Sequence, residues 1–140
     1  MKFSLLFFLF LLLSCNVAPG SYPYAERYEI NLTETDIIQK INDFKIKNPE
    51  YHVPKEFRIT DGKRTENDHW FHVYFYYKEK NIVVKTWIRS KSKAKTIFAF
   101  VGIKKYSENS KWKMINKDFD NLNNKNILDE FENRILKNFN

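Results

Sequence analysis

Three runs of mainly apolar or alternating residues dominate the hydrophobic pattern of the chain, at positions 69–77, 82–89 and 95–104. Each run is rich in β-branched and aromatic side chains, and polar, turn-like segments separate the runs. The pattern predicts three consecutive antiparallel strands, a meander, at the centre of one small sheet.

The loop between the first two predicted strands, residues 78–81, decides which side chains share a face. Its even number of residues makes one face almost wholly apolar, whereas an odd number would mix apolar and polar side chains. We expect the third strand to extend this face by alternation. The predicted apolar face comprises Phe71, Val73, Phe75, Tyr77, Ile82, Val84, Thr86, Ile88, Ile97, Ala99, Val101 and Ile103.

An amphipathic helix is predicted from Thr33 to about Lys47. Thr33 is a good N-cap, and Asp36 can complete a capping box. Asn48 precedes Pro49, which ends the helix. We expect the helix to pack on the apolar face, where each buried side chain contributes about 1.5–3 kcal/mol. Its apolar stripe consists of Ile37, Ile38, Ile41 and Phe44.

A second helix is predicted to close the chain after a short strand at 112–116. Asn124 or Asn126 can cap it. Residues 28–32 have a strand-like pattern, and residues 57–60 can supply a short first strand of the sheet. The predicted fold is therefore α+β: an antiparallel meander of three to five strands, flanked by an N-terminal and a C-terminal helix, in one domain at 26–140. The stripe of the closing helix comprises Ile127, Leu128, Phe131, Ile135 and Phe139.

The second face of the predicted sheet is aromatic and basic, unlike an ordinary core or an ordinary solvent surface. Such a face could stack sugar rings or form a protein hot spot. However, the closing helix needs a surface on which to bury its stripe, so we expect it to cover this face and to leave Trp70, Arg89 and His72 at the rim. The candidate partner-binding residues are Trp70, His72, Trp87 and Arg89. The predicted face also contains Tyr74, Tyr76, Val83, Lys85, Phe98 and Phe100.

The first fifteen residues have the pattern of an export signal. Lys2 precedes an apolar run of roughly a dozen residues, which is shorter than the ~20 residues that span a bilayer. The run ends at Leu12-Leu13-Ser14-Cys15, which resembles the lipobox of bacterial lipoproteins. The resemblance implies a signal peptide at 1–14 and a lipid on Cys15 that holds the protein on a membrane, the outer membrane facing the periplasm. Residues 15–25 are then a lipidated tether, because they contain proline, glycine and serine without periodicity.

The chain carries a formal net charge of +7, and 23 basic and 17 acidic residues remain after residues 1–14 are removed. This excess could favour nucleic acid, anionic lipid or polyanionic glycans, although a lysine-rich composition also arises without any such ligand. Nucleic acid fits poorly with an exported protein. Cys15 is the only cysteine, so no intramolecular disulfide is expected and stability must come from the core.

The sequence offers little catalytic chemistry. It contains no Gly-x-Ser-x-Gly motif and no phosphate-cradling glycine loop. His69 and His72 lie three apart in a predicted strand, so their side chains point to opposite faces and cannot share a metal ion. We expect no cofactor and no metal site. The candidates for a weak hydrolase are Asp61, Glu66, Asp68 and His69.

The expected function is that of a non-enzymatic binding module, held at the cell envelope by a lipid, that binds an envelope protein or glycan. An immunity- or inhibitor-type protein that blocks a secreted enzyme is the main alternative. A weak hydrolase is a third class.

Overall fold

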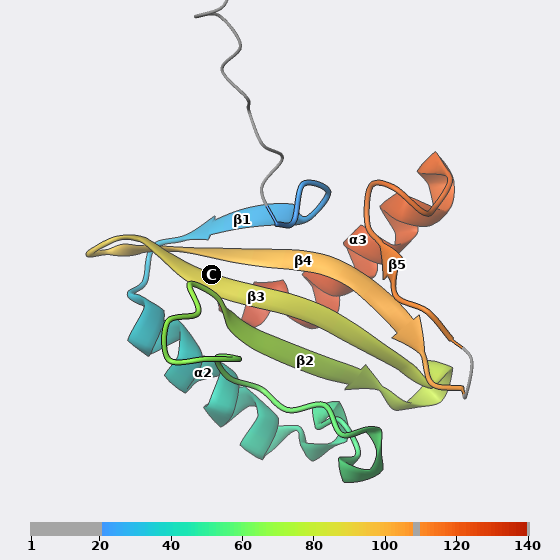
Figure 1. Ribbon diagram of the computed structural model, residues 1–140, viewed down its shortest axis with the longest axis horizontal. Helices are drawn as coiled ribbons and strands as arrows, with labels where there is room; N and C mark the ends of the chain where they lie inside the picture. The colour runs from blue at the N-terminus through green and yellow to red at the C-terminus, as the bar shows by residue number, and fades with distance from the viewer. Residues whose placement is uncertain (1–20, 108–109, 140) are drawn as a thin grey trace, which may run out of the picture.

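The computed structural model describes residues 21–107 and 110–139 (Figure 1). The predicted signal peptide and Cys15 lie outside the described residues, and both stay predictions. Within the described ranges, no helix has the length and apolar character to cross a membrane. The helices and strands are β1 (Glu26–Ile30), α2 (Glu34–Lys47), β2 (Phe71–Tyr77), β3 (Ile82–Ser92), β4 (Lys95–Lys105), β5 (Lys113–Met114) and α3 (Asn121–Arg134).

One antiparallel sheet in the order β1-β4-β3-β2 forms the centre of the molecule, and β5 pairs with β4 beyond the end of β1. Strands β2, β3 and β4 are the predicted meander, so the α+β fold class is confirmed. The strand beside β4 is β1. Residues 57–60 form no strand, because the chain there turns through a 3-10 helix at Lys55–Phe57 and a left-handed Arg58.

The helix caps explain where both helices begin. The Thr33 hydroxyl accepts the Asp36 N–H at 3.1 Å and donates to the Asp36 carboxylate at 2.8 Å, as expected for the first helix. Helix α3 starts earlier than predicted, because the Asp120 carboxylate accepts the Asn123 N–H at 2.9 Å. A carboxylate at this position also interacts favourably with the helix dipole, which favours Asp120 over Asn124 as the cap.

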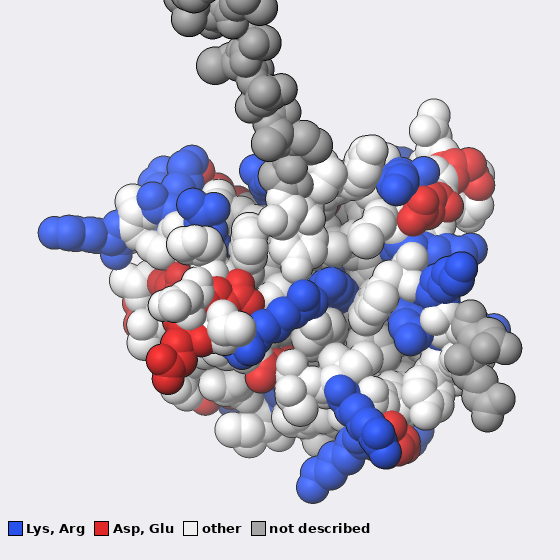
Figure 2. Space-filling view, viewed as in Figure 1, with Lys and Arg blue, Asp and Glu red and all other residues white. Residues whose placement is uncertain are grey.

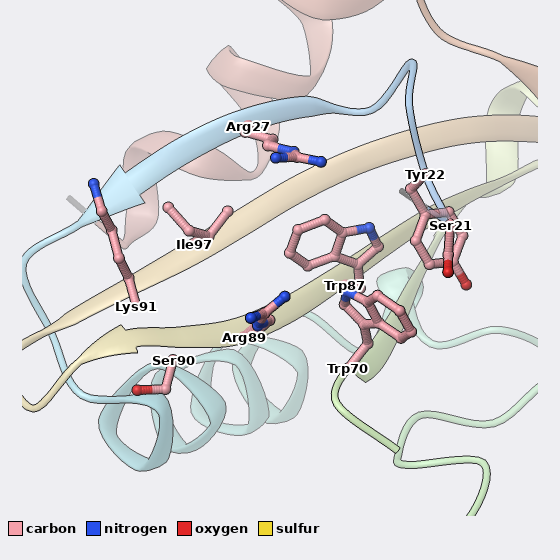
Figure 3. Close-up of a pocket in the computed structure, with 9 residues that line it drawn as sticks. All are labelled: Ser21, Tyr22, Arg27, Trp70, Trp87, Arg89, Ser90, Lys91 and Ile97. Carbon is pink, nitrogen blue, oxygen red and sulfur yellow. The ribbon is translucent and has the colours of Figure 1, made fainter. Parts of the chain in front are cut away.

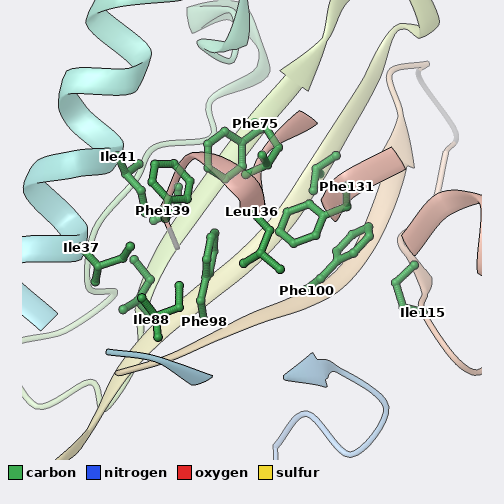
Figure 4. Packing of buried hydrophobic residues seen from close by; sticks show 14 of the residues in the cluster. Ile37, Ile41, Phe75, Ile88, Phe98, Phe100, Ile115, Phe131, Leu136 and Phe139 are labelled. Atoms are coloured by element: carbon green, nitrogen blue, oxygen red, sulfur yellow. The ribbon is translucent and has the colours of Figure 1, made fainter. Parts of the chain in front are cut away.

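Both helices pack on the same face of the sheet, and the main core lies between them and the strands (Figure 4). The Phe131 ring of α3 lies 4.5 Å from the Phe100 ring and 5.7 Å from the Phe98 ring. The prediction that the closing helix covers the aromatic and basic face is therefore wrong. The stripe of α3 finds a better surface on the first face, where it completes an aromatic cluster together with Phe139.

A β-bulge corrects the predicted faces of β4. Thr86 pairs with Phe100 but Lys85 pairs with Gly102, so Val101 is an extra residue in β4. The bulge reverses the alternation, which puts Phe98 and Phe100 in the main core and Ile97, Ala99 and Val101 on the second face. Only Ile103, beyond the bulge, lies on the face predicted for it. On β2 and β3 the prediction from the even loop is confirmed.

Strand β2 is an edge strand, and the outer backbone groups of His72 and Tyr74 are covered. Gly62 and His72 exchange backbone hydrogen bonds of 2.8 and 3.0 Å. At Tyr74 two side chains bind the outer backbone groups. Asp61 accepts a hydrogen bond from the Tyr74 N–H at 2.9 Å, and the Lys45 ammonium group donates to the Tyr74 carbonyl at 2.7 Å. Lys45 and Asp61 also pair with each other. This cover protects the edge against pairing with another chain.

Candidate functional site

The second face of the sheet, which the helices leave uncovered, carries its own small apolar cluster. Tyr22 packs edge-on against Trp70 with 5.4 Å between ring centroids, and it lies 6.1 Å from the Trp87 ring. The two tryptophans are 6.4 Å apart. The buried members of the cluster are Trp87, Ala99 and Val101.

The segment before β1 is therefore part of the packed domain. Tyr22 and Ala25 contact the cluster, and the Ala25 N–H donates to the Tyr22 carbonyl at 3.3 Å. The sequence pattern predicts a tether at 15–25 that would include these residues. The structure corrects the end of this tether, because the Tyr22 ring packs against both tryptophans. Residues 15–20 of the predicted tether lie outside the described residues.

A hollow of about 450 Å³ opens beside this cluster, and we call it the tryptophan hollow (Figure 3). The register of the sheet assembles it: Arg27, Ala99 and Trp87 are paired neighbours that form one row across three strands. Arg89 pairs with Ile97 in the next row but one along the same face. The hollow is lined by Ser21, Tyr22, Arg27, Trp70, Trp87, Arg89, Ser90, Lys91 and Ile97.

Three of the four predicted partner-binding residues, Trp70, Trp87 and Arg89, line this hollow. His72 does not lie at a rim as expected. It is only 2% exposed, because it is paired with Trp87 on the neighbouring strand and lies beside the Tyr22 ring.

Two residues of the hollow, Tyr22 before β1 and Arg27 within it, are not among the predicted site residues. Arg27 is separated by an odd number of positions from Tyr28 and Ile30, which belong to the main core. The alternation of a strand therefore puts Arg27 on the opposite face. This alternation is the signal that could have found Arg27, whereas no local pattern marks the packing of Tyr22.

Two arginines of the hollow have no anionic partner among the residues that the structure describes. Within the ranges 21–107 and 110–139, no carboxylate lies within salt-bridge distance of Arg27 or Arg89. The nearby Glu29 is held by Lys91 and by Lys95, and hydrogen bonds from these two lysines lower the pKa of Glu29 to about 2. Its charge is thus already neutralised, and the hollow keeps a net positive charge.

The positive charge continues along the face toward β5. The Lys85 ammonium nitrogen lies 5.3 Å from the centroid of the Tyr22 ring and 5.6 Å from that of Trp112. Burial lowers the pKa of Lys85, and the neighbouring Arg64 lowers it further. Figure 2, which shows this face, has Lys and Arg side chains across its middle and around its margins.

No protein-family model, no curated protein and no solved structure matches the chain. No site residue can therefore be transferred from a relative. The candidate site is defined by exposure, charge and geometry alone.

Asp68 fixes the loop that carries Trp70 over the hollow. Its two carboxylate oxygens accept the backbone N–H groups of Trp70 and Arg64, both at 3.1 Å, and one oxygen lies 3.2 Å from Nε2 of His72. Hydrogen bonds from the backbone, first that of Trp70, lower the pKa of Asp68. Asp68 is thus a positioning residue for the hollow.

The acidic residues proposed for a weak hydrolase do not converge on a reactive group. Asp61 is held by Lys45 and the Tyr74 N–H, while Asp68 is held by the backbone and His72. Glu66 and His69 are exposed. In the described part of the chain, no three His, Cys, Asp or Glu side chains are close enough together to hold a metal ion.

His72 should make the stability of the domain depend on pH. Burial, and then the charge of Arg64, lower the pKa of His72 below 6.5, although Asp68 opposes both effects and Lys85 adds to them. The unfolded chain then binds more protons than the folded chain between the folded pKa and 6.5. We expect the free energy of unfolding to fall as the pH drops below 6.5, by up to about 1.4 kcal/mol per pH unit.

Urea denaturation between pH 5 and 7.5 measures this dependence. The His72→Gln variant should lose that part of the slope, while the titration of Asp68 at lower pH remains. Parallel curves for the two proteins would contradict the inference that His72 is kept neutral by the fold.

Proposed function

We propose that the chain is a lipid-anchored protein of the cell envelope and that its tryptophan hollow binds another envelope component, a protein or a glycan. The observation that carries the proposal is a hollow on the face that α2 and α3 leave uncovered. It combines Trp70 and Trp87 with two arginines that form no salt bridge within residues 21–107 and 110–139. Tryptophan and arginine are the residues that dominate binding free energies at recognition sites. The proposal includes no catalytic step.

The chemistry of the face supports binding rather than a structural role for these residues. Arg89 is exposed, and Trp70 is partly exposed beside it. A buried sheet face would be filled with apolar side chains, as the opposite face is. Arginines without an ion pair contribute little to the stability of a domain, but their planar forks bind carboxylate, sulfate or phosphate groups well.

Substitution of the hollow should weaken attachment to the envelope component. In the unlipidated Cys15→Ser protein, we expect Trp70→Ala and Arg89→Gln each to reduce binding to isolated cell envelopes at least tenfold. Both positions are on the surface of the hollow, so both variants should keep their fold, which near-ultraviolet circular dichroism checks. Arg58→Gln is the matched control, because Arg58 is exposed and does not line the hollow. Unchanged binding by both hollow variants would refute this part of the proposal.

The anchor is tested separately from the hollow. Replacing Cys15 with serine removes the thiol on which a lipid would be attached. We expect the protein to move from the membrane fraction to the soluble fraction and its mass to lack the acyl chains. The two or three acyl chains that would hold the protein on a bilayer are then absent. A Cys15→Ser protein that stays tightly membrane-bound with an unshifted mass would overturn the anchor while leaving the hollow untouched.

A further inference from the structure

The size of the tryptophan hollow fits a small ring-shaped group. Its volume of about 450 Å³ lies in the range of ligand sites, about 300–1,000 Å³. Figure 3 shows the Trp70 and Trp87 rings next to each other at its centre, with Arg27 above the Trp87 ring and Arg89 to the left of Trp70. The hollow therefore combines two aromatic rings with two cations.

The two cations call for an anionic ligand. Arg27 lies on β1 and Arg89 on β3, and Ile97 of β4, which is paired with Arg89, separates them. The Cζ atom of Arg27 is 5.9 Å from the centroid of the Trp87 ring. A neutral apolar partner would strip water from both guanidinium groups without replacing it, at a cost in free energy. A carboxylate or sulfate group would instead accept hydrogen bonds from the guanidinium group of either arginine.

A buried hydrogen-bond donor gives a second, independent indication of a polar ligand. Trp87 is only 4% exposed, and its indole N–H has no hydrogen-bond partner in the described part of the chain. Figure 3 shows the indole nitrogen on the side of the ring that faces Tyr22. A buried donor without an acceptor is costly, and a hydroxyl or ring oxygen of a ligand that displaced the Tyr22 side chain would satisfy it.

These three features together define one class of ligand. The flat C–H face of a sugar ring packs on the electron-rich face of an indole. Its hydroxyl groups accept and donate hydrogen bonds, and an acidic substituent supplies the charge. On the basis of the function proposed above, we infer that the tryptophan hollow binds an acidic saccharide, with the sugar ring on Trp70 and its carboxylate or sulfate group between Arg27 and Arg89.

Calorimetric titration of the full mature protein, in neutral detergent, tests the inference. The probes are trigalacturonic acid, its methyl ester, a sulfated heparin tetrasaccharide and neutral maltotriose. We expect at least one acidic probe to bind, and its neutral counterpart, the methyl ester or maltotriose, to bind at least tenfold more weakly. The affinity for the acidic probe should fall as salt rises from 50 to 500 mM, because exposed charges are screened.

Variants then distinguish specific recognition from non-specific charge attraction. Arg27→Gln, Arg89→Gln and Trp70→Ala should each weaken binding of the acidic probe at least tenfold, while Arg58→Gln should leave it unchanged. If neither acidic probe binds, or if Trp70→Ala binds as well as the unaltered protein, the inference is wrong. Binding to phosphatidylglycerol vesicles that needs the same arginines, without any sugar binding, would assign the hollow to a lipid headgroup instead.

The two levels of the proposal fail in different ways. Hollow variants that lose envelope binding although no acidic sugar binds would leave the proposed function in place and eliminate the saccharide. Variants that retain envelope binding, together with no sugar binding, would eliminate both.

Discussion

Replacing Phe98 with alanine should lower the free energy of unfolding by about 3–5 kcal/mol. The Phe98 ring is 0% exposed and lies 5.7–6.5 Å from three other phenylalanine rings of the main core. Its removal would leave a cavity that the strands and helices cannot close. Because whole domains are stable by only about 5–15 kcal/mol, the loss should be evident in the midpoint of urea denaturation.

Ile97 provides the matched control, because it is the next residue on the same strand and lies on the other face. It is half-buried and lines the tryptophan hollow. We expect Ile97→Ala to cost only about 1 kcal/mol, since much of this side chain is already in contact with water. Equal losses for the two variants would mean that the bulge at Val101 does not set the faces of β4.

Replacing Asp61 with asparagine should lower the free energy of unfolding by about 3 kcal/mol. Lys45 is only 3% exposed, and burial lowers its pKa while Asp61 opposes that shift. Asparagine keeps an oxygen for the Tyr74 N–H, which Asp61 accepts at 2.9 Å, so the substitution removes mainly the charge. The buried ammonium group would be left without its counter-ion, and urea denaturation at pH 7 measures the cost.

The Lys45→Met variant separates this charge effect from edge packing. Methionine removes the buried charge and can pack on Phe75, whose ring centroid lies 4.9 Å from the Lys45 ammonium nitrogen. We expect Lys45→Met to cost less than about 1 kcal/mol, and Asp61→Asn to cost about 2 kcal/mol less in that background than alone. Strictly additive losses in this double-mutant cycle would show that the two side chains do not stabilise each other.

The β2–β3 hairpin could be predicted because its information is local. The four-residue loop after Tyr77 fixes the pairing of Tyr77 with Ile82, and strict alternation carries this pairing to Phe71 and Ile88. The helix α2 is local in the same sense, since Thr33 and Asp36 form the cap within one turn. Both features depend on neighbours within a few residues, so the sequence pattern is enough.

The faces of β4 could not be predicted by alternation alone, because the bulge depends on contacts with distant chain segments. Gly102 lies beside the extra residue, and any Cβ atom there would collide with the Lys113 carbonyl oxygen of β5. A glycine within a strand often marks such a bulge or close approach. This glycine was the available signal. It gives the place of an irregularity but not the number of residues that the irregularity inserts.

The candidate site was only partly accessible to sequence reasoning for the same reason. Trp70, Trp87 and Arg89 follow from strand alternation, and they line the hollow. Tyr22 and Arg27 come from segments distant in sequence, and only the pairing of β1 with β4 brings them to the same place. Which face of the sheet α3 packs on depends on the aromatic surface that each face offers. That surface is a property of the assembled sheet.

If Cys15 carries the proposed lipid, the position of Tyr22 in the wall of the hollow limits which ligands can reach the hollow. Only six residues lie between Tyr22 and Cys15, so even a fully stretched backbone spans no more than about 25 Å from one to the other. With a lipid on Cys15, the aromatic rings of the hollow would therefore stay close to the plane of the lipid headgroups. A long polymer would have to lie along the bilayer to touch them, while short fragments could arrive from the open side.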